Sequence, residues 1–169
     1  MARTSVPLRR WRRVEYERLV EKGIFRPDDR VELLDGLLVV KEPQDSAHAT
    51  GVAVVADALR AAFGTGWRLR QGAPVALDRW SEPEPDVSVV PGSPRDYRDA
   101  HPTQPVLIVE VSYSRLHFDR TRKASAYARA GIADYWIVDV IGRALEVHRG
   151  PGRVESRPRH WRYRSVAPR

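Results

Sequence analysis

Apolar residues along this chain gather in short runs that are typical of β-strands. The run 106–109 consists of four consecutive aliphatic residues after Pro105, a pattern that indicates a strand buried on both faces. Residues 87–90 and 133–140 have a similar character. We therefore expect these three runs to form the centre of a β-sheet.

Two further apolar runs, 31–34 and 37–40, flank the dipeptide Asp35-Gly36. Asp-Gly tolerates the positive φ angles of a tight two-residue turn, so this stretch predicts a β-hairpin. Helical spacing marks three other stretches: 12–22, 46–63 and 119–130. Shorter strands are expected at 67–70, 74–77 and 144–148. From Arg149 onward the sequence is basic and poorly patterned.

The order of these elements predicts an α/β (α+β) fold, with a mixed central β-sheet flanked by helices and with an N-terminal helix and β-hairpin. The chain has 169 residues, 42% of them hydrophobic, which is enough for one core. We expect a basic N-terminal arm at 1–13, one domain at 14–150 and a basic C-terminal tail at 151–169.

The absence of cysteine excludes disulfides and thiolate metal sites, and it agrees with a cytoplasmic protein. No apolar run approaches the roughly 20 residues that a membrane-spanning helix needs, so no membrane partner is expected.

The net charge of +7 is concentrated at the two ends of the chain. Residues 1–13 hold five arginines and no acidic residue, and residues 149–169 hold seven arginines with one acid, Glu155. Basic segments can contact the phosphates of a nucleic acid, and the interleaved Trp161 and Tyr163 favour that interpretation. The alternative is that both ends are simply solvated.

Two carboxylates lie next to buried runs, which marks them as candidates for chemistry. Asp86 directly precedes the run 87–90, and Glu110 directly follows the run 106–109. Burying an ionised carboxylate without a partner costs several kcal/mol, so such a group must be paired, protonated or bound to a metal ion.

A lysine belongs to the same picture. Asp119, Lys123 and Tyr127 are spaced four residues apart in the expected helix and therefore share one face. Only three of the 29 basic residues are lysines, which weakly indicates that a compact ammonium group matters at Lys123. Two carboxylates and a lysine are a common apparatus for phosphodiester hydrolysis with Mg²⁺ or Mn²⁺.

Glu32 and His48 each have two interpretations. The alternation of the first hairpin strand favours a solvent-facing Glu32, but a third acid of the site is the alternative. His48 stands in the first turn of an expected helix, where it is either a surface histidine or a site histidine.

Several stretches together carry a resemblance to a known family: 31–36, 46–48, 84–87, 108–112, 119–123 and, most specific, 127–139. They resemble the Uma-two family of restriction-endonuclease-like proteins, within the PD-(D/E)XK nuclease superfamily. The resemblance implies a restriction-endonuclease-like fold. It also implies that Asp86 and Glu110 are metal ligands, that Glu32 is an additional acid and that Lys123 is the catalytic lysine.

One departure from the superfamily pattern is clear. The lysine commonly lies two residues after the glutamate, and here that position is Ser112. Lys123 can replace it only if its helix packs over the end of the strand. Ser112 joins His48, Asp119 and Tyr127 as possible accessory residues.

Two functions follow as hypotheses. The first is a Mg²⁺-dependent endodeoxyribonuclease. An enzyme of this kind that cuts both DNA strands would commonly act as a homodimer. The second is a catalytically inactive module on the same fold, which binds nucleic acid or a protein partner without turnover.

Overall fold

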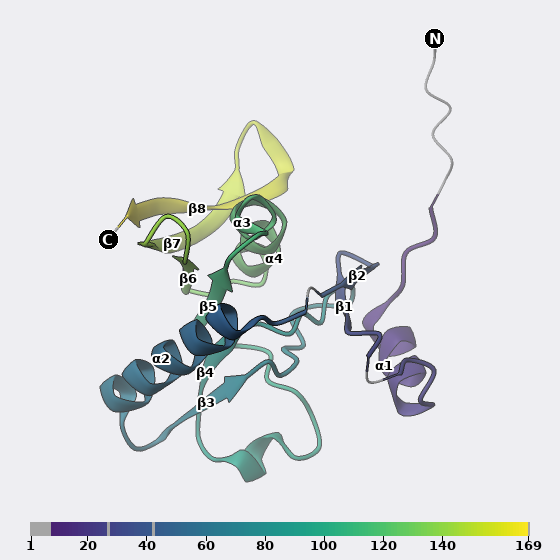
Figure 1. Ribbon diagram of the computed structural model, residues 1–169. Helices are drawn as coiled ribbons and strands as arrows, with labels where there is room; N and C mark the ends of the chain where they lie inside the picture. Colours follow the sequence, from purple (N-terminus) through teal and green to yellow (C-terminus); the bar gives the residue numbers. More distant parts are fainter. Residues whose placement is uncertain (1–7, 27, 42, 169) are drawn as a thin grey trace.

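The computed structural model describes residues 8–26, 28–41 and 43–168 (Figure 1). Its helical segments are α1 (Arg13–Glu21), α2 (Ser46–Phe63), the 3₁₀-helix η1 (Pro94–Tyr97), α3 (Leu116–Phe118), the π-helical η2 (Asp119–Lys123) and α4 (Ala124–Arg129). Its strands are β1 (Val31–Leu34), β2 (Leu37–Val40), β3 (Trp67–Gln71), β4 (Val87–Pro91), β5 (Leu107–Ser112), β6 (Asp134–Asp139), β7 (Ala144–Val154) and β8 (Arg157–Pro168).

The central sheet has six strands in the order β3-β4-β5-β6-β7-β8. The pair β5 and β6 is parallel, because the helical connection α3-η2-α4 crosses over between these two strands. The remaining neighbours are antiparallel. The expected mixed sheet flanked by helices is therefore confirmed, and β3 and β8 are its edge strands.

Helix α2 covers one face of the sheet. Its buried residues Val52, Ala56 and Leu59 pack against alternate residues of β4 and β5. A Cβ atom on Gly51 would come within 3.0 Å of Val111 Cγ1, so the small residues of this helix permit a close approach. Asp45 caps the helix by accepting a hydrogen bond from the backbone N–H of His48, a contact worth about 1 kcal/mol.

The opposite face holds a second core, in which α4 packs against the sheet. Tyr127 of α4 is fully buried together with Ile108, Tyr135 and Ile137 of the neighbouring strands. Tyr163 of β8 belongs to the same core, and Figure 1 shows the β7–β8 ribbon next to α3 and α4. Every ring in this cluster with a hydroxyl group has a partner for it, as buried tyrosines require.

The β1–β2 hairpin lies beside the sheet as a separate two-stranded unit. Asp35 and Gly36 have φ angles of 53° and 77°, which confirms the expected turn. Arg129 of α4 fixes that turn by donating to Asp35 Oδ1 at 2.7 Å and to Asp78 Oδ2 at 3.0 Å. This anchorage holds the hairpin, and Glu32 within it, against the rest of the molecule.

The structure differs from the sequence-based expectation in three elements. Residues 74–77 form no strand, although Val75 and Leu77 are buried and their backbone N–H groups bond to the segment 81–83. The helix expected at 119–130 begins earlier, at Leu116, and contains a π-turn. Gly131, with φ of 77°, ends it as expected.

The third difference concerns the chain ends. The stretch 151–168, expected to be a tail, instead belongs to β7 and β8, with Tyr163 in the core. The strand character of β8 was hidden because arginines and prolines interrupt its apolar positions. Of the expected N-terminal arm, residues 1–7 lie outside the described residues, and the N–H of Trp11 bonds to Gly36 O. No helix within the described ranges is long and apolar enough to cross a membrane.

Candidate active site

A polar cavity of about 110 Å³ opens beside the C-terminal half of β5. Its walls come from five separate parts of the chain: the hairpin contributes Glu32, the start of α2 contributes His48, the segment before β4 contributes Asp86, β5 contributes Glu110, and η2 contributes Lys123. The structure therefore brings these five sequence-predicted residues to one pocket, whereas Tyr127 does not line it and contacts Glu110 from the core.

Glu110 stands at the floor of this pocket with 3% of its surface exposed. Lys123 Nζ donates to its Oε1 at 2.9 Å, and the hydroxyl of Tyr127 donates to the same oxygen at 2.7 Å. Burial raises the pKa of Glu110 to about 8, an effect that Lys123 opposes and that nearby carboxylates strengthen. Its ionised form therefore depends on a cation beside it.

Lys123 supplies such a cation from η2. Its ammonium group lies 2.9 Å from Glu110 and 3.4 Å from Glu32 Oε1, and the side chain is almost fully buried. Burial disfavours the charged form, but Glu110, Glu32 and Asp119 outweigh burial and raise the pKa of Lys123. Lys123 keeps its proton at neutral pH, so the cost of burial falls on Glu110.

Glu32 is buried, with 2% of its surface exposed, so the solvent-facing interpretation is wrong. Its two oxygens have different partners: Oε1 faces Lys123, and Oε2 accepts a hydrogen bond from the backbone N–H of Glu84 at 2.9 Å. Alternation failed here because Leu33 and Leu34 are buried as well, and the strand packs on both sides.

Asp86 and His48 form a pair at the rim. Asp86 Oδ2 accepts from the backbone N–H of Val111 at 2.7 Å, which fixes the carboxylate one residue beyond Glu110. His48 Nε2 lies 3.1 Å from the same oxygen. The hydrogen bond to Asp86 raises the pKa of His48 although burial opposes it. His48 is therefore a pocket residue and not a surface histidine.

Ser112 and Asp119 complete the polar lining. Burial raises the pKa of Asp119, and Lys123 opposes the shift. The hydroxyl of Ser112 is buried beside the Asp119 carboxylate and lowers its pKa.

Comparison with known proteins shows the family of the chain and a relative with a similar fold. Residues 13–166 match the model of the Uma2 family, described as "putative restriction endonuclease". The chain belongs to the Uma2 family. The crystal structure of a "putative nuclease belonging to DUF820" from Anabaena variabilis ATCC 29413 has a similar fold, with a TM-score of 0.67. The two sequences are 14% identical, over 92% of this chain and 82% of that chain. No curated protein matches the chain.

Sequence reasoning missed several pocket residues of this Uma2 chain. Arg30, Lys41, Glu84 and Arg115 also line the cavity. Lys41 and Glu84 form an ion pair of 2.7 Å across its side. The signal for Glu84 was its place two residues before Asp86. Arg30 carries no comparable signal, because its φ of 42° is visible only in the structure.

The donor set of this Uma2 pocket fits a hard divalent cation. Among the described residues no three Asp, Glu or His side chains are grouped as a ready-made metal site. Mg²⁺, however, is commonly bound through one or two carboxylates, with waters and substrate phosphates completing its shell. Asp86 and Glu110 provide two carboxylates in this pocket.

Proposed function

We propose that this protein is a Mg²⁺- or Mn²⁺-dependent endodeoxyribonuclease. The observation that carries the proposal is the contact between Lys123 Nζ and Glu110 Oε1, 2.9 Å long, in a pocket that Asp86 also lines. The superfamily lysine two residues after the glutamate is Ser112 here, but an ammonium group from η2 reaches the same carboxylate. Two acids and one lysine thus face a single cavity.

The proposed roles follow from the contacts. Asp86 and Glu110 would hold the divalent ion, which supplies Lewis acidity and lowers the pKa of a bound water. Lys123, protonated and anchored by Glu110, stabilises negative charge on a phosphate oxygen that enters the pocket. Glu32 is an additional acid that orients Lys123, and Tyr127 orients Glu110. His48 holds Asp86 in place.

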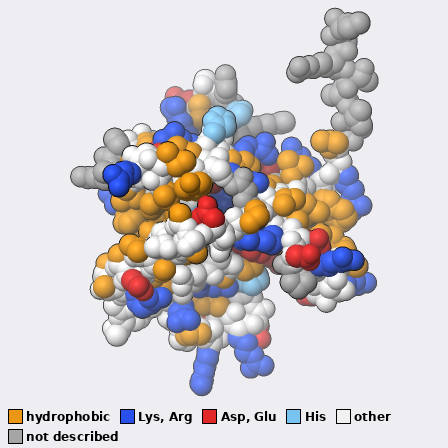
Figure 2. All heavy atoms as spheres, viewed as in Figure 1, with side chains coloured by type: hydrophobic (Ala, Val, Ile, Leu, Met, Phe, Trp, Pro, Cys, Tyr) orange, Lys and Arg blue, Asp and Glu red, His pale blue; other side chains and the backbone are white. Residues whose placement is uncertain are grey.

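A nucleic-acid substrate agrees with the cationic side chains of the pocket, which stand beside six acidic residues whose charge a divalent ion would screen. Arg30, Lys41 and Arg115 line it, and Figure 2 shows Lys and Arg side chains spread over the visible face. Cationic groups of this kind bind phosphates regardless of sequence. DNA is the proposed substrate, and cleavage of both strands would be served by a homodimer.

A plasmid-nicking assay tests the proposal. Supercoiled DNA is incubated with the protein and millimolar Mg²⁺ or Mn²⁺, with EDTA as the metal-free control. Wild type is expected to nick the plasmid only with metal, and Asp86→Asn and Glu110→Gln are expected to abolish nicking. The matched control is Asp134→Asn, which removes a carboxylate paired with Arg149, away from the pocket.

A melting experiment separates metal binding from chemistry. Mg²⁺ is expected to raise the melting temperature of wild type and of Asp134→Asn, but not of Glu110→Gln, because a ligand that binds only the native state stabilises it. Wild type that neither nicks DNA nor responds to either metal would contradict the proposal.

The second candidate, an inactive module that binds nucleic acid, is favoured by one observation. The Lys123 ammonium already bridges Glu110 and Glu32, so it competes with a metal ion for both carboxylates. DNA binding without nicking, and without a metal-dependent melting shift, would select this function.

A further inference from the structure

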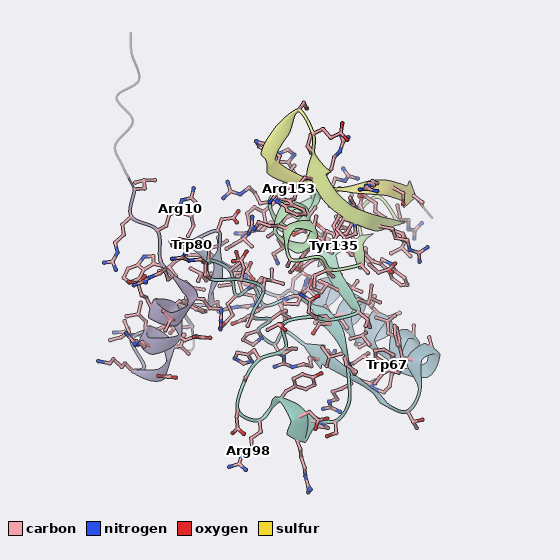
Figure 3. All side chains as sticks on the ribbon, turned by 180° about the vertical axis from the view of Figure 1, so that it is seen from behind. Arg10, Trp67, Trp80, Arg98, Tyr135 and Arg153 are labelled. Carbon is pink, nitrogen blue, oxygen red and sulfur yellow. The ribbon has the colours of Figure 1, made fainter. Side chains whose placement is uncertain are left out.

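The edge strand β3 carries a second polar cleft that the proposed active site does not use. The cleft has a volume of about 400 Å³ and lies over β3, the end of α2 and η1. Its polar lining is dominated by Arg60, Arg68 and Arg70, with Tyr97 opposite. Figure 3 shows Trp67, at the start of β3, beside α2, and Arg98, just past η1, on the neighbouring loop.

The positive charge of this cleft is not balanced. No Asp or Glu of the described residues lines it. Arg68 is exposed and makes no ion pair within the described part of the chain. Arg70 donates to the carbonyl of Pro74 at 3.0 Å and lies 3.3 Å from His101 Nδ1, so neither partner is an anion. Burial lowers the pKa of Arg70.

Arg60 is the partial exception, since it pairs with Asp57 of its own helix at 2.6 Å. That pair is largely exposed to solvent and contributes little binding energy of its own. Arg70 also lies over the ring of Tyr97, with 5.8 Å between Cζ and the ring centroid. The cleft is therefore cationic, with an aromatic wall that limits the movement of one guanidinium group.

The strand register places these arginines on the same side of the sheet as the pocket. Arg70 pairs with Ser88, and Ser88 pairs with Ile108, which belongs to the core under α4. Side chains alternate along a strand, so Arg68 and Arg70 share a face with Ile108 and with Glu110, two residues further along. Leu69, between the two arginines, packs on the α2 side.

The strand also leads toward the pocket. Directly after β3, the N–H of Gly72 bonds to the carbonyls of Pro85 and Asp86, both at 3.1 Å. The cleft thus begins beside the segment that carries Asp86 and continues along the free edge of the sheet. Arg68 and Arg70 are two residues apart, which separates their Cα atoms by about 6.6 Å along the strand.

We propose that Arg68 and Arg70 form a track for the phosphodiester backbone of DNA that flanks the proposed cleavage site. This inference rests on the proposed function and names how the substrate is held outside the pocket. Guanidinium groups bind phosphate through two parallel hydrogen bonds, and such contacts position a duplex without reading its sequence. The track adds affinity for DNA that is longer than the pocket itself.

A competing explanation is that the arginines only protect an edge strand. Charged side chains on a free edge prevent pairing with other chains, and such a role needs no ligand. The two explanations differ in what removing the charges does: loss of a track weakens DNA binding, whereas loss of edge protection promotes self-association.

Binding of a labelled DNA duplex, measured by fluorescence anisotropy in EDTA at several KCl concentrations, tests the track without any need for catalysis. Affinity falls with salt, and each lost phosphate contact reduces the magnitude of the slope of log affinity against log salt by about 0.9 on duplex DNA. Arg68→Gln/Arg70→Gln is expected to reduce the slope by up to about 1.8. The matched control, Arg18→Gln/Lys22→Gln, removes two exposed positive charges, one in α1 and one directly after it, and is expected to leave the slope unchanged.

The single substitution Arg68→Gln keeps the test valid if the double variant misfolds, because it breaks no ion pair within the described part of the chain. Its expected reduction in the magnitude of the slope is about 0.9. An unchanged slope for the folded variants, or self-association seen by sedimentation without weaker binding, would overturn the track. If these variants bind DNA more weakly and wild type never nicks DNA, the track is supported and only the proposed nuclease activity is refuted.

Discussion

Replacing Lys123 by methionine tests the electrostatic reasoning behind the site. Methionine keeps much of the length of the side chain but removes the ammonium group that lies between Glu110 and Glu32. At pH 9, above the pKa of about 8 that Glu110 has in the native protein, the Glu110 carboxylate is ionised and then remains buried without its cation. Removing one partner of a buried ion pair typically costs about 3–5 kcal/mol.

For a domain of 150–250 residues, each kcal/mol shifts the melting temperature by roughly 2–4 °C, so Lys123→Met is expected to lower it by about 6–20 °C. Urea unfolding in EDTA measures the free energy directly, and an unchanged m-value shows that the unfolded state is the same. Adding Glu110→Gln to Lys123→Met is expected to recover part of the loss, because it removes one uncompensated charge.

Lys22→Met is the matched control, because Lys22 is exposed directly after α1 and its replacement is expected to change stability by no more than about 0.5 kcal/mol. A loss below about 1 kcal/mol for Lys123→Met would refute the reasoning. It would mean that Lys123 does not hold the Glu110 carboxylate as an anion.

Three further outcomes are expected. Burial and the neighbouring Glu17 raise the pKa of Glu82 to about 8. The stability that this shift contributes is fully present below the ordinary pKa of a glutamate and is lost as pH rises through 8. Glu82→Gln should abolish that loss, as measured by urea unfolding between pH 5 and 8. Arg30→Gly relieves a left-handed backbone and should change stability by less than about 1 kcal/mol while weakening DNA binding in anisotropy assays. Arg153, whose Cζ lies 5.2 Å from the ring centroid of Trp161, should contribute about 0.9 to the magnitude of the slope of log DNA affinity against log salt. An unchanged slope for Arg153→Gln would show that this residue of the β7–β8 ribbon, labelled in Figure 3, does not contact DNA.

The fold was accessible from the sequence where local patterns agree with tertiary packing. Asp35-Gly36 forms the expected hairpin turn, the run 106–109 is largely buried, and Gly131 follows the end of its helix. The failures have an opposite cause. Residues 74–77 have the alternation of a strand but take their hydrogen bonds from an irregular segment, and β8 forms because β7 offers a partner edge, which no local pattern reveals.

The candidate site, like the fold, could be predicted from the sequence only in part. The carboxylates Asp86 and Glu110 were visible because charge beside an apolar run is costly unless it is compensated. Burial of Glu32 was not visible, since it depends on how the hairpin docks through Arg129. Arg30 was missed for a related reason: its position in the pocket results from a backbone conformation that the residue type does not predict.

The π-turn in η2 explains how one helix serves three positions of the site. In an α-helix a step of four residues overshoots a full turn by about 40°, so Asp119, Lys123 and Tyr127 would spread over about 80°. The N–H of Ala124 instead bonds to the carbonyl of Asp119, five residues earlier, which widens the turn between the first two. All three side chains are consequently buried, and Lys123 and Tyr127 meet on the same oxygen of Glu110. The helix thereby supplies the ammonium group that the strand, with Ser112 two residues after Glu110, lacks.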